Sequence, residues 1–303
     1  GSLPGNDCDD TRSAVSPLGT ETCATSYDDD CDGSDNDVGA TSCLTFYYDG
    51  DADGYGIGTT QCTCEESGFY SADNDDDCDD TDELVNPGGS ESGGVEGLDD
   101  DCDEWIDEHL VAVGDLVITE MMINSIESGT ETYEWFEVYN DSGRTLYLDG
   151  WFFEEVNSSG TNPYYPFFIS PDAALQVDDM EYLVFCATST IPGVTCDYVY
   201  RSNAFTDSAY GAADNGSHAL SNTSGTIRLG LVYGTGATAV ALDSVSYSST
   251  FGYSNGVSAE LSINHTDATS NDVGTNWCAA TYIYSTDGGN NYGTPGEDNE
   301  CAL

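Results

Sequence analysis

The sequence has very few positively charged side chains. It contains no lysine, and four arginines stand against 57 Asp and Glu residues, which gives a net charge of −53. Nucleic-acid phosphates and anionic lipid surfaces would repel such a chain. We therefore expect no nucleic acid among its partners, and we expect a cation to be its natural ligand.

Histidine and long apolar segments are also scarce. The three histidines, His109, His218 and His265, have no metal-binding spacing and lie near no candidate nucleophile, so we expect them on the surface or in turns. No segment approaches the roughly 20 consecutive apolar residues that a membrane-spanning helix needs. The sequence thus predicts a protein that is not an enzyme and does not insert directly into a membrane.

Cysteine is abundant, and its distribution divides the chain. Residues 1–110 hold eight of the 12 cysteines and 32 of the 57 carboxylates. An even number of cysteines in an acidic chain indicates disulfides formed in an oxidising compartment, so we expect a secreted, extracellular or cell-surface protein. No C-x-x-C pair is present, which disfavours a zinc site. We expect two domains, an Asp- and Cys-rich region over 1–110 and a second domain over 111–303.

The first region contains an internal repeat. The segment "DCDDTRSAVSPLGTE" at 7–21 recurs as "DCDDTDELVNPGGSE" at 77–91, and each copy continues to an acidic segment, "DDDCDGSDND" from Asp28 and "DDDCDEWIDE" from Asp99. Between the copies lies a different segment, "YYDGDADGYGIG". Random acidic runs do not repeat with cysteines in register, so the repeat argues against a merely solvated acidic linker.

Alternating acids within these segments favour calcium. The pattern D-x-D-x-D-G occurs at 28–33 and 49–54, and 99–104 keeps its acids but has Glu104 in place of the glycine. Carboxylates at alternate positions can converge on one hard ion, and the glycine permits the sharp turn. No flanking helical periodicity is present, so we expect several Ca²⁺ ions in loops without helices. The predicted metal ligands are Asp7, Asp9, Asp28, Asp30, Asp32, Asn36, Asp49, Asp51, Asp53, Asp75, Asp77, Asp79, Asp99, Asp101, Asp103 and Asp107.

The repeated unit resembles the MopE-like metal-binding repeat of bacterial secreted and surface proteins, over about residues 5–108. The resemblance implies metal binding rather than catalysis. Within it, the second copy has Gly93 where the first has Cys23, yet it keeps Cys78 and Cys102. Loss of one cysteine with retention of that pair predicts the bridges Cys78–Cys102 and Cys8–Cys31. Cys23, Cys43, Cys62 and Cys64 then pair among themselves, in an arrangement that the sequence leaves open.

Residues 111–303 have a different character. Short alternating runs such as "LVITEMMIN", "YEWFEVYN" and "GTIRLGLVY" are separated by Gly, Asn and Ser, which predicts a β-sandwich. Their order resembles that of a lamin tail domain, an immunoglobulin-like sandwich, over about 113–300. Cys186 and Cys196 flank a Pro-Gly turn and are predicted to bridge a hairpin, and Cys278 and Cys301 to fasten the C-terminal tail.

Two features of this second region allow a functional and a structural interpretation. Glu120 and Glu137 on neighbouring expected strands could form a hydrolytic pair, but turn and loop hydrogen bonding is favoured. The aromatic segment at 162–171, with Tyr164, Tyr165, Phe167 and Phe168, could bind carbohydrate or a partner chain, or could pack over the sandwich edge.

The leading hypothesis is a secreted, non-enzymatic calcium-binding structural protein, with the sandwich as an interaction or self-assembly module that could form filaments. One alternative is an extracellular module for a glycan or a transition metal. Another is the accessory part of a secreted hydrolase. General halophilic acidity would also give the net charge, but it predicts diffuse rather than clustered acids.

Overall fold

The protein is described by a computed structural model over residues 7–35, 38–91, 98–103, 106, 111–126, 133–148, 150–156, 167–169, 174–201, 220–231 and 240–303. The chain divides into two compact units, Gly1–Glu104 and Trp105–Leu303, which are described separately below. Among the described residues, no helix has the length and apolar character required to span a membrane.

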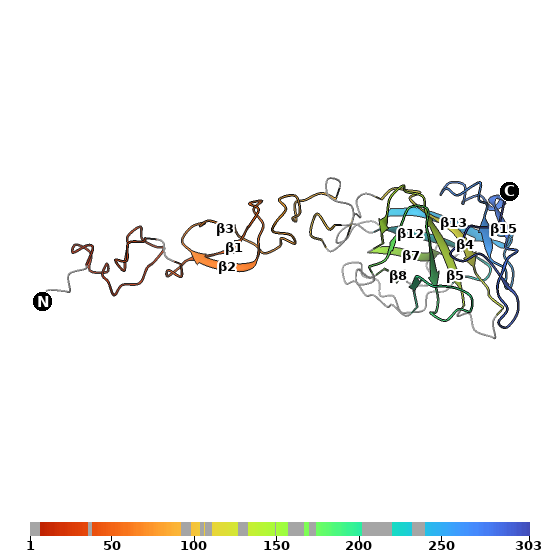
Figure 1. Ribbon diagram of the computed structural model, residues 1–303, viewed down its shortest axis with the longest axis horizontal. Coiled ribbons are helices and arrows are strands. Elements are labelled where there is room, and N and C mark those ends of the chain that lie inside the picture. The colour runs from red at the N-terminus through yellow and green to blue at the C-terminus, as the bar shows by residue number, and fades with distance from the viewer. Residues whose placement is uncertain are drawn as a thin grey trace. The chain divides into compact units, whose positions relative to one another are not determined.

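The first unit has little regular structure. Its strands β1 (Leu44–Tyr48), β2 (Ile57–Thr63) and β3 (Tyr70–Ala72) form an antiparallel sheet in the order β2-β1-β3 (Figure 1). The described apolar side chains that are buried in this unit are few and scattered: Val15, Ala40, Ala72 and Val85. So small an apolar core cannot by itself offset the conformational entropy lost when about a hundred residues fold.

Four disulfides cross-link this unit. They join Cys8 to Cys31, Cys23 to Cys64, Cys43 to Cys62 and Cys78 to Cys102. The first and last are the pairs expected from the two repeat copies, and the other two give the arrangement that the sequence leaves open. Cys43–Cys62 ties the start of β1 to β2, and Cys23–Cys64 ties the first copy to the β-hairpin.

The second unit is a sandwich of two sheets, as predicted (Figure 1). One sheet has the order β11-β10-β5-β4-β14-β15 and the other the order β13-β12-β7-β8. The first comprises β4 (Leu116–Met122), β5 (Trp135–Asn140), β10 (Tyr182–Cys186), β11 (Tyr198–Val199), β14 (Ala259–Leu261) and β15 (Trp277–Ala279). The second comprises β7 (Trp151–Val156), β8 (Phe167–Phe168), β12 (Ser224–Leu231) and β13 (Val240–Ser248).

Short elements complete the unit. Strands β6 (Leu146–Tyr147) and β9 (Gln176–Val177) pair with each other, as do β16 (Ile283–Ser285) and β17 (Asn291–Tyr292). Two 3₁₀ turns, η3 (Ser249–Phe251) and η4 (Gly274–Asn276), flank β14 in the sequence.

Aromatic side chains join the two sheets. The ring of Phe153 in β7 lies 5.2 Å from that of Phe136 in β5 and 4.4 Å from that of Phe185 in β10, measured between centroids. Phe167 in β8 stacks on Phe153 at 5.1 Å and is fully buried. Phe167 therefore packs within the sandwich, whereas Phe168 is buried beside Phe152, with 6.4 Å between the ring centroids. Tyr164 and Tyr165 lie outside the described residues.

Both predicted bridges of the second unit are present, but one connects different elements from those expected. Cys186 and Cys196 are joined, as are Cys278 and Cys301. The hairpin expected around the first bridge is wrong, because β10 and β11 run parallel, with Cys186 opposite Val199. For β11 to run parallel to β10, the chain must first cross back along the length of β10. The disulfide joins the end of β10 to a residue shortly before β11.

Glu120 and Glu137 belong to a row of three buried carboxyls. Glu120 in β4 lies opposite Glu137 in β5 and Glu260 in β14, and none of the three is more than 1% exposed. The C-terminal segment covers them: the Thr294 N–H donates to Glu120 at 3.1 Å, and the Gly296 N–H to Glu137 at 2.7 Å. Burial, with the charge of Glu260 adding to it, raises the pKa of Glu120 to about 8. The row thus holds the C-terminal segment through backbone hydrogen bonds, in agreement with the structural interpretation.

We expect the second unit to lose stability as the pH rises toward about 8. A Glu carboxyl titrates near pH 4.3 in the unfolded chain, so between that pH and about 8 the folded state binds more protons. This contribution to stability is complete below the lower pKa and disappears as the pH passes the upper one. All four Trp residues lie at position 105 or later, so the midpoint of thermal unfolding followed by Trp fluorescence reports on this unit.

The matched variant is Glu120→Gln, which keeps the shape of the side chain and cannot ionise. Its midpoint should change less between pH 5 and pH 9 than that of the unmodified protein. Parallel pH profiles for the two proteins would contradict the assignment of the raised pKa to this residue.

Candidate metal sites

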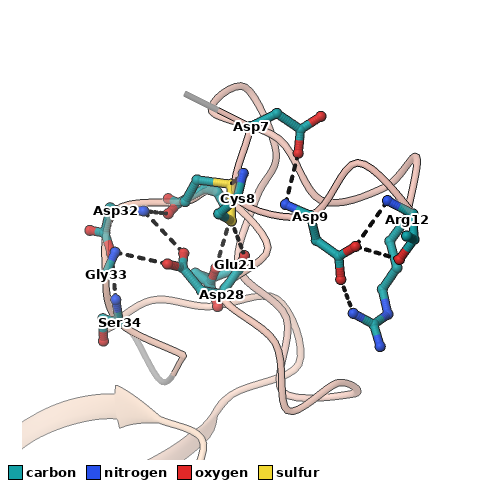
Figure 2. Close-up of a disulfide and its surroundings, with 12 residues drawn as sticks. Asp7, Cys8, Asp9, Arg12, Glu21, Asp28, Asp32, Gly33 and Ser34 are labelled. Carbon is teal, nitrogen blue, oxygen red and sulfur yellow. Dashed lines mark hydrogen bonds and ion pairs between the residues drawn. A yellow bond between two sulfur atoms is a disulfide. The ribbon is translucent and has the colours of Figure 1, made fainter. Parts of the chain in front are cut away.

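The two repeat copies share one backbone framework. In the first copy, around the disulfide of Cys8 (Figure 2), the Cys8 N–H donates to the Cys31 sulfur at 3.1 Å. In the second copy the Cys78 N–H donates to the Cys102 sulfur at 3.2 Å. Cys31 and Cys102 both have a left-handed backbone, with φ of 61° and 56°. In each copy the chain therefore reverses within the acidic segment, and an equivalent disulfide fixes the reversal.

A glycine in each copy lets the chain pass close to the acidic segment. A Cβ on Gly19 would lie 2.2 Å from the Asp29 carbonyl oxygen, and one on Gly89 would lie 2.1 Å from that of Asp100. These contacts are too short for any side chain. The glycines explain why "PLG" and "PGG" precede the glutamate of each copy at a fixed distance.

The first acidic cluster consists of Glu21, Asp28 and Asp30. One carboxylate oxygen from each lies within 4.8 Å of the others. Glu21 is 4% exposed; its Oε1 accepts the Asp30 N–H at 3.0 Å, while its Oε2 is buried and accepts no hydrogen bond from any residue that the structure describes. Figure 2 shows Asp28 beside Glu21, with the Asp28 carboxylate accepting the Asp32 and Gly33 N–H groups. A buried acceptor without a donor is the position that a cation would stabilise.

The second copy repeats this cluster with Glu91, Asp99 and Asp101, again within 4.8 Å. The Asp100 and Asp101 N–H groups donate to Glu91 Oε1 at 2.9 and 3.2 Å. The Oδ1 atom of Asp101 is buried without a donor among the described residues. Two independent copies thus converge on a Glu-Asp-Asp set.

The middle segment forms a third cluster from Asp49, Asp51 and Asp53, also within 4.8 Å. Asp49 is 3% exposed and accepts the Ala52 N–H at 2.7 Å and the Ser71 hydroxyl at 2.9 Å. Gly54, with φ of 100°, turns the chain after the third acid. Burial raises the pKa of Asp51, and the neighbouring charge of Asp53 adds to the effect.

The other residues predicted as metal ligands do not belong to the three clusters. Asp32 and Asp103 instead donate their N–H groups to Asp28 Oδ1 and Asp99 Oδ1, at 3.0 and 3.1 Å. Asp9 binds Arg12 and Thr11, and hydrogen bonding from Thr11 lowers its pKa. Asp7, Asp75, Asp77 and Asp79 lie outside the three clusters, and Asn36 and Asp107 lie outside the described residues.

Sequence reasoning missed Glu21 and Glu91 as members of the clusters. Each ends the repeated segment at the same position, seven or eight residues before the acidic pair that it joins. The shared position of the two glutamates is the sequence feature that indicates them as candidate ligands. The alternating aspartates point instead to ligands within the acidic segments alone. The glycine contact and the disulfide bring each glutamate next to the acidic segment in space. A local sequence pattern does not reveal such a contact.

The donor set suits a hard cation. Every candidate ligand in the three clusters is a carboxylate oxygen, and all 12 cysteines are in disulfides. His265 belongs to the second unit, and the other two histidines lie outside the described residues. Oxygen-only sites favour Ca²⁺, Mg²⁺ or Mn²⁺, whereas copper and zinc favour imidazole and sulfur.

Comparison with known proteins supports metal binding by the two copies. A family model, Cu-binding MopE, described as "Putative metal-binding motif", matches residues 7–37 and 77–108. No curated protein matches this chain. Among solved structures, a DUF4876 family protein from Bacteroides thetaiotaomicron is similar, with 15% identity and a TM-score of 0.38 over 50% of this chain and 63% of that chain. The metal-binding resemblance is thus confirmed for the two copies, and the middle cluster lies outside the matched residues.

Replacing the buried glutamate of either copy should weaken one cation site. Glu21→Gln and Glu91→Gln each remove a ligand charge but keep the Oε1 acceptor, and we expect roughly tenfold or greater loss of Ca²⁺ affinity at one site. Isothermal titration of the oxidised protein measures the effect. Glu66→Gln, at an exposed position outside the clusters, removes the same net charge and should leave the titration unchanged. Equal effects of all three variants would contradict the assignment.

Proposed function

We propose that the protein is a secreted, non-enzymatic calcium-binding structural protein of a cell surface or extracellular matrix. Its first unit is a spacer ordered by calcium and disulfides. Its second unit, a sandwich of the lamin tail type, is the module for interaction or assembly. The observation that carries the proposal is the presence of three all-carboxylate clusters in a unit that has almost no apolar core.

The choice of calcium rests on ligand chemistry and on compartment. Carboxylate oxygens at these separations suit a large hard ion with flexible coordination. Six disulfides are typical of extracellular proteins, where calcium is plentiful. Ion binding would neutralise carboxylates that otherwise repel one another, so binding free energy would become folding free energy.

Calcium removal should therefore unfold the first unit selectively. We expect titration of the oxidised protein to give several bound Ca²⁺ ions. In excess chelator, calorimetry should lose the transition of the first unit, while the Trp-detected transition of the sandwich persists, because all Trp residues belong to the second unit. The absence of bound Ca²⁺, with identical calorimetric traces in calcium and chelator, would overturn the proposal and favour general acidity.

Assembly is the second part of the proposal. Calcium would reduce the repulsion between copies of a chain with net charge −53, and the outermost strands of the two sheets offer edges for pairing between chains. Light scattering coupled to size-exclusion chromatography should show larger species in calcium than in chelator. The same monomer in both conditions would exclude self-assembly and leave the calcium-binding unit intact.

A further inference from the structure

The beginning of the second copy packs against the middle acidic loop. The Gly50 N–H donates to Asp80 Oδ1 at 2.6 Å, and the Asp77 N–H donates to the Gly56 carbonyl at 3.1 Å. A Cβ on Gly50 would lie 2.7 Å from Asp80 Oδ2 and 2.8 Å from its carbonyl oxygen. Two segments, joined by contacts between residues 21 and 30 positions apart, are therefore in direct contact, with acidic side chains from both at the junction.

The carboxylates at this junction act on one another. Burial raises the pKa of Asp51, and the charges of Asp53, Asp77 and Asp80 raise it further. Burial likewise raises the pKa of Asp77, with added contributions from Asp53 and Asp80. Arg12, the one arginine of this unit, is bound to Asp9 in the first copy. The acids at the junction therefore have no arginine or lysine to neutralise them.

Among the described residues, buried oxygens without donors lie in both segments of the junction. Asp77 is 8% exposed; its Oδ1 accepts the Asp79 N–H, but its Oδ2 accepts no hydrogen bond from any described residue. The Oδ2 atoms of Asp51 and Asp53 are buried and without donors in the same way. Three such acceptors, contributed by two segments that are in contact, are buried oxygens of the kind that a bound cation stabilises.

We propose that the loop acids Asp49, Asp51 and Asp53, together with Asp77 and Asp80 of the second copy, bind one divalent cation. This inference rests on the proposed calcium-binding function and extends it to a site that joins two parts of the unit. The carboxylate set, together with the extracellular compartment proposed above, favours Ca²⁺ as the bound ion. The metal would fasten the second copy to the β-hairpin region.

The arrangement of the disulfides shows what a cation at this junction would add. The first copy is tied to the hairpin covalently, through Cys23–Cys64. The second copy has Gly93 at the position of Cys23 and therefore lacks an equivalent bridge. A cation held by both segments supplies that connection in a form that depends on the calcium concentration.

The repeat offers matched controls for a test. Asp7 and Asp10 of the first copy correspond to Asp77 and Asp80, but Asp10 is exposed and no acidic loop precedes it in the described chain. Asp77→Asn and Asp80→Asn keep the Oδ1 acceptors that bind the Asp79 and Gly50 N–H groups. Calcium titration of the oxidised protein should show tenfold or greater weakening of one site in these two variants. Asp7→Asn and Asp10→Asn should leave that site unchanged.

A second measurement tests the link itself. Residues 73, 75 and 76 are exposed aspartates in the connection between the hairpin region and the second copy. In saturating calcium, a protease specific for aspartate should cut this connection several-fold faster in Asp80→Asn than in Asp10→Asn. Mass spectrometry of the intact proteins verifies that all six disulfides have formed in each variant.

The outcomes separate the two proposals. If the unmodified protein binds no Ca²⁺, both the calcium function and the junction site are wrong. If it binds Ca²⁺ but Asp77→Asn and Asp80→Asn titrate and are cut like their first-copy counterparts, the junction site alone is wrong. Selective weakening and faster cutting in the second-copy variants support the site.

Discussion

Mutual repulsion among carboxylates is the constraint on which the rest of this structure depends. Every arginine has an acidic partner, in the pairs Arg12–Asp9, Arg144–Asp115, Arg201–Glu134 and Arg228–Glu154. The chain therefore has no further cationic side chains with which to neutralise the remaining acids. The two units meet this constraint differently: the first gathers carboxylates where an external ion can bind, and the second uses them as acceptors for backbone N–H groups.

The sandwich shows how an acidic chain can fold around its own carboxylates. Asp243 accepts the Ile118 N–H at 2.8 Å, Glu155 the Ser221 N–H at 2.9 Å, and Asp197 the Val184 N–H at 2.8 Å. The first two of these acids are buried, so each would be costly without its donors. Their bonds fix strand edges and loop ends, and the aromatic core supplies the apolar contacts. The second unit therefore has its own source of stability.

Local sequence patterns predicted the strands and the repeated disulfides, because these features depend on short or repeated segments. Alternating runs gave the strands, and the two repeat copies gave the bridges Cys8–Cys31 and Cys78–Cys102. Contacts between distant segments were beyond such patterns. Glu21 and Glu91 reach their clusters through a folded-back chain, and the parallel pairing of β10 with β11 depends on the whole sheet. Alternation placed Glu120 and Glu137 on strands but could not show that Glu260 would join them under the C-terminal segment.

Disulfides and cations have different effects on the first unit, so neither can replace the other. Its four bridges join residues 19 to 41 positions apart. Each removes unfolded-state entropy worth about 3 to 4 kcal/mol, but none reduces charge repulsion in the folded state. A bound cation reduces that repulsion, since it draws carboxylates together and offsets their charge in the folded state. Covalent links therefore set which segments are neighbours, and under the proposed function ion binding would decide whether those neighbours hold one conformation. In a unit whose described part buries so few apolar groups, order would then follow the concentration of the ion.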